Sequence, residues 1–229
     1  MHFLLCVLVL LPNGKNTEYL GDHSFTQGEY VHALEYYYEA YDSPIVFVKR
    51  ARTLSILRDQ GLVCDYDAYV SVILEYLCWA VEQDSSVLSL IIEDTCFYEI
   101  SHTVLFRSWQ GHEPENDSGL ASLLPRVRWY NYVESITAVG GQMVFHDDGA
   151  VYVDWGTYYG YDEETGEFIA YPQEQQTGHF VVKEGYVDIL WDDKSKSVYR
   201  LDMRGTCGVL IDVDTGQDVV FDQPDECNT

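Results

Sequence analysis

The spacing of hydrophobic residues changes near residue 113. Before this point they recur every three to four residues, which is the period of a helix with one buried face. One such face carries Val70, Ile73, Leu74, Leu77 and Val81. After this point hydrophobic and polar residues alternate, as in Val151–Trp155 and Val187–Trp191, a pattern typical of half-buried strands. We therefore predict an α+β fold in which N-terminal antiparallel helical hairpins precede an antiparallel β-barrel or sandwich.

The helical pattern predicts five helices, joined by segments short enough to favour antiparallel neighbours. Their expected ranges are 15–26, 28–42, 44–60, 66–82 and 85–108, the last with room for a break. Asp65 or Asp67 is expected to cap the helix over 66–82, and Asp84 or Ser85 the helix that follows.

The domain organisation follows from the change of pattern. Residues 113–125 hold two prolines, a glycine and several polar residues, a composition typical of a linker. We expect a possible signal segment over 1–13, a helical domain over 14–112, this linker, and an antiparallel β domain over 126–229.

Turn-forming residues divide the β half into short segments. They occur at 147–149, 164–166, 184–185, 192–194 and 214–216. Each supplies a residue that tolerates positive φ or hydrogen-bonds its own backbone. Eight to ten strands are expected, and such a density of strands and hairpins is typical of a barrel or a sandwich.

An unbroken hydrophobic run, Phe3–Leu11, stands near the start of the chain. It is too short to span a bilayer, which needs about 20 residues, and its length suits the hydrophobic part of a secretory signal. No basic residue precedes the run and no small-residue cleavage site follows it. A buried strand or helix, or the remnant of a longer signal, is therefore the alternative. The signal interpretation predicts a secreted or periplasmic protein.

The cysteines form no C-x-x-C pair, which argues against a structural zinc site or a redox motif. Cys207 and Cys227 flank the last predicted hairpin, and export would make a structural disulfide between them favourable. Among Cys64, Cys78 and Cys96, one pair and one free thiol is the simplest expectation. The alternative is that all the cysteines are small buried hydrophobic residues.

Composition and charge narrow the classes of partner. Hydrophobic residues make up 47% of the 229 residues, enough to build a core. The 38 acidic and 13 basic side chains give a formal net charge of −25. Nucleic acids and anionic membranes both require a basic surface, so we expect neither as a partner. Basic proteins, metal cations and neutral ligands remain.

Small residues, aromatic residues and one leucine recur at helical spacing in residues 16–44, and a proline closes the segment. They are Leu20, Gly21, Gly28, Tyr30, Ala33, Tyr37, Ala40 and Pro44. This segment resembles one tetratricopeptide repeat, a helix–turn–helix of 34 residues. The resemblance implies two closely packed helices, and a family whose usual activity is to bind peptides or protein helices in a concave groove.

The resemblance weakens outside this segment and is imperfect within it. Thr17 and Ser24 stand where the family has aromatic residues. In the next copy Gly61 and Ala68 are seven positions apart, where the pattern has five. A generic helical bundle is therefore the alternative, since stable arrays need about three units. No binding residue carries over, because the groove positions are not part of the repeat signature.

Acidic residues around Gly216 raise the question of a metal site. Asp212, Asp214 and Asp218 are close in sequence, but Gly216 comes one position too early for a helix–loop–helix calcium loop. A type I turn with a bulge is the favoured interpretation, and the metal site is a weak alternative. The sequences following His112 and His146 are also acidic, and we interpret both histidines as solvated loop residues.

Aromatic residues in the β half give a weak candidate for ligand binding. Trp155, Tyr158 and Tyr159 flank a glycine turn and are the best candidates for an exposed cluster that stacks on sugars or peptides. Ordinary strand and core positions are the alternative.

Nucleophile elbows, phosphate-binding glycine loops and dinucleotide fingerprints are absent from the sequence. We therefore expect a non-enzymatic protein-interaction or scaffold protein, without a cofactor, that binds a protein partner through the helical half. The alternative is a β-barrel that binds a small ligand or carbohydrate. A ligand barrel needs small or polar inward residues, whereas the inward set expected here is bulky: Val151, Val153, Trp155, Val187, Ile189 and Trp191.

Overall fold

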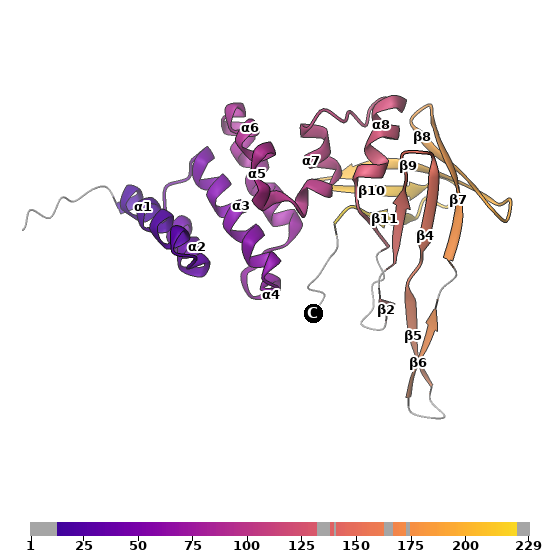
Figure 1. Cartoon of the computed structure of the whole chain (residues 1–229), viewed down its shortest axis with the longest axis horizontal. Coiled ribbons are helices and arrows are strands. Elements are labelled where there is room, and N and C mark those ends of the chain that lie inside the picture. Colours follow the sequence, from indigo (N-terminus) through magenta and orange to yellow (C-terminus); the bar gives the residue numbers. More distant parts are fainter. Residues whose placement is uncertain (1–12, 132–137, 140, 163–166, 173–174, 224–229) are drawn as a thin grey trace, which may run out of the picture. The chain divides into compact units, whose positions relative to one another are not determined.

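The computed structural model describes residues 13–131, 138–139, 141–162, 167–172 and 175–223 (Figure 1). It divides into two compact units, residues 1–96 and 97–229. The boundary lies earlier than the predicted linker over 113–125. The linker prediction is wrong because this segment contains a helix whose leucines are buried in the core of the second unit.

The first unit is helical. Its helices are α1 (Asn13–Thr26), α2 (Tyr30–Glu39), α3 (Pro44–Asp59), α4 (Val63–Tyr66), α5 (Val70–Gln83) and α6 (Leu88–Glu93), with a 3-10 turn η1 (Ser85–Val87) before α6. The first three predicted helices and the helix over 66–82 are confirmed within a few residues. The break expected in the last helix is also confirmed. The short helix α4 is an addition, since four residues are too few to show a helical period.

Local sequence fixes where these helices begin. The Ser43 hydroxyl accepts a hydrogen bond from the Val46 N–H, and Pro44 occupies the first turn of α3, where its missing N–H costs nothing. The Asp84 cap is confirmed, because its carboxylate accepts from the Ser86 N–H. The cap predicted at Asp65 or Asp67 is wrong. Tyr69 precedes α5, while Asp67 ends α4 in the left-handed region.

The predicted hydrophobic face of α5 is buried, except for Val81, which is half-buried. Its buried residues include Val70, Ile73, Leu74 and Leu77. Helices α1 and α2 pack tightly, because a Cβ at Gly21 would come within 2.5 Å of the Tyr37 ring. Gly28, another small residue of the repeat-like segment, lies in the turn between these helices. Its φ is 78°, a conformation that favours glycine after a helix.

The second unit contains a closed antiparallel barrel in the order β1-β11-β10-β9-β8-β7-β4-β3. Its strands are β1 (Trp129–Tyr130), β3 (Gln142–Phe145), β4 (Ala150–Asp154), β7 (Gln175–Lys183), β8 (Tyr186–Trp191), β9 (Lys196–Arg204), β10 (Cys207–Asp212) and β11 (Asp218–Phe221). A separate three-stranded sheet consists of β2 (Ala138–Val139), β5 (Thr157–Asp162) and β6 (Glu167–Pro172). The α+β prediction is confirmed, and of the two β architectures expected, the barrel is the one found.

Turns fall where the sequence places them. Glu184 and Gly185 both have positive φ between β7 and β8, and Gly149, Lys194 and Gly216 have positive φ in the other expected turns that are described. The turn between β9 and β10, where Gly205 has a φ of 63°, was not expected. The turn expected at 164–166 lies outside the described residues.

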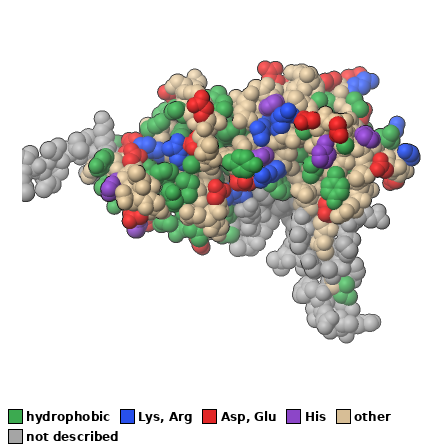
Figure 2. Space-filling model, in the orientation of Figure 1, with side chains coloured by type: hydrophobic (Ala, Val, Ile, Leu, Met, Phe, Trp, Pro, Cys, Tyr) green, Lys and Arg blue, Asp and Glu red, His purple; other side chains and the backbone are tan. Residues whose placement is uncertain are grey.

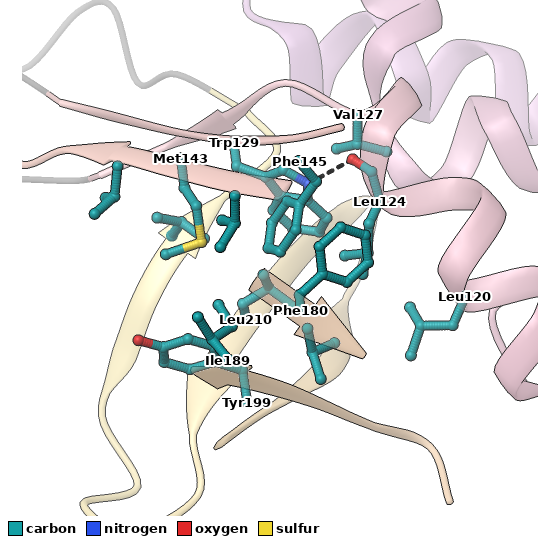
Figure 3. Close-up of a cluster of buried hydrophobic side chains, with 14 of the residues drawn as sticks. Leu120, Leu124, Val127, Trp129, Met143, Phe145, Phe180, Ile189, Tyr199 and Leu210 are labelled. Carbon is teal, nitrogen blue, oxygen red and sulfur yellow. Dashed lines mark hydrogen bonds between the residues drawn. The ribbon is translucent and has the colours of Figure 1, made fainter. Parts of the chain in front are cut away.

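Bulky side chains fill the barrel (Figure 3). Five of the six expected inward residues are buried, and Trp155 is half-buried against the same core. The indole N–H of Trp129 donates to the Leu124 carbonyl at 3.2 Å. The interior therefore has the composition of a packed core rather than that of a ligand cavity.

Helical segments before β1 complete this core. They are η2 (Thr95–Phe97), which spans the boundary, η3 (Ile100–His102), α7 (Val104–Trp109), α8 (Asp117–Leu123) and η4 (Leu124–Arg126). Val104, Leu120, Leu123 and Leu124 belong to the barrel's hydrophobic cluster. The β unit thus carries its own helical cover.

Two carboxylates join this cover to the strands. Asp222, directly after β11, is buried, and its oxygens accept from the N–H of Val104 at 2.7 Å and of Gly208 at 2.8 Å. Asp117 at the start of α8 accepts from the Glu184 and Gly185 N–H groups in the β7–β8 turn.

Cys207 is a free thiol, so the predicted Cys207–Cys227 disulfide is wrong, and Cys227 lies outside the described residues. Burial and the neighbouring Asp222 carboxylate raise the pKa of the Cys207 thiol to about 12. Cys78 and Cys96 are free as well, whereas Cys64 is disulfide-bonded. The pair expected among these three does not form.

Candidate functional site

One face of α3 lines two hollows in the helical unit. The hollow toward α6 has a volume of about 350 Å³, and the hollow toward α1 has a volume of about 210 Å³. Lys49 and Arg52 line both, so the hollows are neighbours across these two side chains. Ile45 lies one helical turn before Lys49 on the same face. We refer to the two hollows together as the α3 groove.

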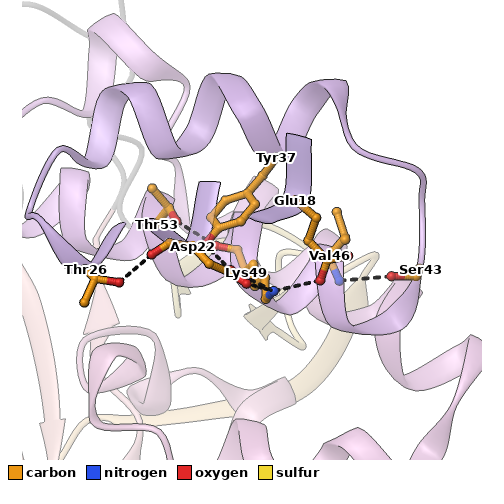
Figure 4. A network of polar contacts seen from close by, with 8 residues as sticks. All are labelled: Glu18, Asp22, Thr26, Tyr37, Ser43, Val46, Lys49 and Thr53. Carbon is orange, nitrogen blue, oxygen red and sulfur yellow. Dashed lines mark hydrogen bonds and ion pairs between the residues drawn. The ribbon is translucent and has the colours of Figure 1, made fainter. Parts of the chain in front are cut away.

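Lys49 organises the side of the α3 groove that faces α1 (Figure 4). Its Nζ lies 2.7 Å from Glu18 Oε1 and 2.7 Å from Asp22 Oδ1. The Tyr37 hydroxyl donates to the same Asp22 oxygen at 2.8 Å. Burial and this hydrogen bond raise the pKa of Tyr37 above its ordinary value, so the hydroxyl stays protonated and remains a donor. Asp22 therefore links α1 to both α2 and α3.

Arg52 organises the side that faces α6. Its Nε and Nη2 both contact one oxygen of Asp94. The other oxygen of Asp94 accepts from the Cys96 N–H at 3.0 Å, which fixes the carboxylate. Hydrophobic side chains flank this ion pair, with Leu90 51% exposed and Ile45 38% exposed. The groove thus joins an ordered polar floor to an accessible hydrophobic rim.

The charge of the α3 groove is negative. Two basic side chains, Lys49 and Arg52, are matched by Glu18, Asp22 and Asp94, and Glu93 adds a fourth carboxylate. Glu93 forms no ion pair within the described part of the chain. In Figure 2 the blue side chains at the left of the view lie beside red and green ones. The groove therefore has one exposed carboxylate without an ion pair among the described residues, next to exposed Leu90.

The described thiols are not activated as nucleophiles. Burial, with nearby carboxylates, raises the pKa of Cys78, Cys96 and Cys207 above the ordinary value of a thiol. Within the described ranges no three His, Cys, Asp or Glu side chains are grouped to hold a metal ion. These groups therefore offer neither a ready thiolate nor a preformed metal centre.

The described residues give no support to the weak metal interpretation of the acidic turn. Asp212 Oδ1 accepts from the N–H and the hydroxyl of Thr215 at 2.7 and 2.8 Å. Asp218 instead forms a bidentate pair with Arg204, and Asp214 is exposed. The turn interpretation is confirmed, with Gly216 at positive φ and an irregular register between β10 and β11.

The aromatic candidates are only partly described. Trp155 is half-buried and packs against the barrel core, so it is not an exposed stacking surface. Tyr158 and Tyr159 lie in β5, and their side chains fall outside the described part of the structure. None of the three aromatic residues predicted to bind a ligand is therefore both described and exposed.

Sequence reasoning missed the α3 groove. Lys49 and Arg52 stand three positions apart on one helix, a spacing that places two of the few basic residues on one face. Their partners, Asp22 and Asp94, lie 27 and 42 positions away. Only the fold reveals this pairing.

Comparison with protein-family models, curated protein sequences and solved structures yields no match to this chain. Among the described residues, none of the helices combines the length and the hydrophobicity needed to cross a membrane.

Proposed function

We propose that this chain is a non-enzymatic protein-binding protein whose helical unit takes its partner in the α3 groove. The observation that carries the proposal is the juxtaposition of exposed Leu90 and Ile45 with the accessible carboxylate of Glu93. Hydrophobic contact area gives binding energy, while fixed charges select the partner. The ion pairs of Lys49 and Arg52 hold the floor of the groove in one arrangement.

The partner best suited to this groove is a basic peptide segment with an aliphatic side chain. A Lys or Arg of the partner would pair with Glu93, and the neighbouring aliphatic group would cover Leu90. The chain's net charge of −25 favours the same choice, because long-range attraction speeds encounter with basic partners.

The resemblance of residues 16–44 to a tetratricopeptide repeat supports this function, since that family binds peptides in a concave groove. The β unit would stabilise or present the helical unit, and the hydrophobic N-terminal run would direct the protein to a secreted or periplasmic location. The alternative of a ligand-binding barrel gains no support from an interior filled by buried Val, Ile, Phe and Trp side chains.

A peptide-display selection against the whole chain tests the proposal. We expect selected peptides to be enriched in a basic residue close to a Leu, Ile or Val. Their affinity should fall about tenfold or more in the Leu90→Asp and Glu93→Lys variants, since each change removes one half of the recognition. Isothermal titration calorimetry on the selected peptides gives these affinities.

The matched control is Val181→Asp, the same kind of change at a side chain of the β unit that is 64% exposed. It should leave peptide affinity unchanged. Peptides with no basic preference, or binding that both groove variants retain, would contradict the proposal.

A further inference from the structure

Basic side chains gather around the helical cover of the β unit, in a protein that is otherwise strongly acidic. Arg107 of α7 donates through Nε to the Arg126 carbonyl at 3.2 Å. The backbone N–H of His112 donates to the Arg107 carbonyl at 3.1 Å. Ser122 connects the same groups, because its carbonyl accepts from Arg126 and its hydroxyl contacts His112 Nδ1 at 3.1 Å. Backbone groups and Ser122 thus hold the side chains of Arg107, Arg126 and His112 in one hydrogen-bonded cluster.

Arg107 is the cation of this cluster that lacks a counterion. Its guanidinium contacts the Arg126 carbonyl and the Gln110 side chain, and no carboxylate among the described residues. Arginine has five N–H donors, so three have no protein partner among the described residues. Burial and the like charge of Arg126 lower the pKa of Arg107. Arg126 is itself held by an ion pair with exposed Asp147, 3.1 Å away.

His112 extends the cluster with a group that can acquire charge. The Ser122 hydroxyl donates to the Gly119 carbonyl at 3.0 Å, so it accepts from His112 Nδ1. Burial, followed by the charges of Arg126 and Arg107, lowers the pKa of His112. These two arginines, from η4 and α7, are the charged groups that act on it. Both effects favour the neutral form of the ring in the absence of an anion.

We propose that Arg107, Arg126 and His112 form a binding site for a single oxyanion, a phosphate or carboxylate group of a ligand. The unused N–H groups of Arg107 supply charge-assisted hydrogen bonds of the kind that suit both anions. An anion placed there offsets the repulsion between the two guanidinium groups and favours the protonated form of His112. The site is separate from the α3 groove and does not depend on the function proposed for it.

An NMR titration of the whole chain with sodium sulfate tests the site. Sulfate is a suitable probe because its charge does not change between pH 5 and 8. We expect saturable shifts of the Arg107 Nε–H and His112 ring signals, beyond those caused by sodium chloride of equal ionic strength. Bound sulfate should also raise the pKa of His112. Sodium acetate in place of sulfate then distinguishes a carboxylate site from one that requires a tetrahedral dianion.

Variants distinguish a specific sulfate-binding site from non-specific electrostatic attraction. Arg107→Gln removes the charge but keeps hydrogen-bonding capacity, and should weaken sulfate binding about tenfold or more. Arg126→Gln should also weaken it, which provides a second measurement if Arg107→Gln does not fold. Arg200→Gln, at an exposed position of β9, is the matched control and should bind sulfate like the original chain. Non-saturable shifts, or equal binding by Arg107→Gln, Arg126→Gln and Arg200→Gln, would overturn the proposal.

Discussion

Asp222 shows how one buried carboxylate holds two segments together. It fixes the start of α7 to the start of strand β10 through two N–H groups that would otherwise be buried without acceptors. Gly208 allows this approach, because a Cβ there would come within 2.4 Å of the Val104 side chain. The cost is the removal of a carboxylate from water. Burial raises the pKa of Asp222 to about 6, although the hydrogen bonds from Val104 and Gly208 act in the opposite direction.

The raised pKa of Asp222 predicts that the free energy of unfolding falls as pH increases from about 4 to 6. In this interval the folded state keeps a proton that the unfolded state, with an ordinary pKa of 3.8, has released. The stabilisation that protonated Asp222 gives the folded state is complete below pH 3.8 and is lost once the pH exceeds about 6. Its slope is about 1.4 kcal/mol per pH unit, with a total of at most roughly 3 kcal/mol. Urea unfolding at several pH values, followed by spectroscopic signals of the β unit, measures this pH dependence.

Asp222→Asn isolates this effect. The amide does not titrate, so the slope between pH 4 and 6 should decrease in the variant. Stability at pH 7 should also fall, because a single carbonyl oxygen cannot replace two carboxylate oxygens facing two N–H donors. Asp214→Asn, at an exposed position, is the matched control. An unchanged slope in Asp222→Asn would refute the assignment.

At the scale of elements, close packing of α1 on α2 depends on Gly21. The Tyr37 ring lies against this glycine and cannot retreat easily, because it is buried and its hydroxyl is bonded to Asp22. Tyr37 also lines the α3 groove, together with Asp22 of α1. Packing and groove geometry are therefore coupled in the helical unit.

Gly21→Ala should destabilise the helical unit. Alanine favours a helix over glycine by about 1 kcal/mol, but forcing a methyl group against a packed ring costs about 1–3 kcal/mol. We expect a net loss of roughly 1 kcal/mol, measured by urea unfolding followed at the helical unit. A second change, Tyr37→Leu, should make the added alanine less costly. A gain in stability for Gly21→Ala alone would show that the helices can separate freely.

The elements differ in how far sequence alone predicts them. The face of α5 was predictable because Val70, Ile73 and Leu74 carry its period within one helix. The role of α8 was not, because its leucines are buried by strands that come later in the chain. The α3 groove escaped prediction for the same reason, since Lys49 meets its partners only after the helices pack. Periodicity reports local burial, whereas pairing between distant segments requires the fold.

At the scale of the whole molecule, the change in hydrophobic period does not coincide with the division into units. The period changes near residue 113, whereas the compact units divide after Cys96. The segment between these points is helical by pattern but belongs to the β unit by burial. Val104 illustrates this, since it lies in α7 and belongs to the barrel's hydrophobic cluster.

Two truncated chains should therefore behave differently. Residues 97–229 keep the barrel with its helical cover and should unfold cooperatively on their own. Residues 126–229, which begin where the sequence places the β domain, lack Leu120, Leu123, Leu124 and the Val104 N–H. Each lost leucine removes about 1.5–3 kcal/mol of hydrophobic stabilisation, and Asp222 and the β7–β8 turn lose partners as well. Since domains of this size are stable by only about 5–15 kcal/mol, the shorter chain should be unfolded or aggregated.

Amide NMR dispersion and urea unfolding of both chains show whether each one folds cooperatively. A stable, cooperatively unfolding 126–229 chain would show that the helices decorate the barrel rather than complete its core.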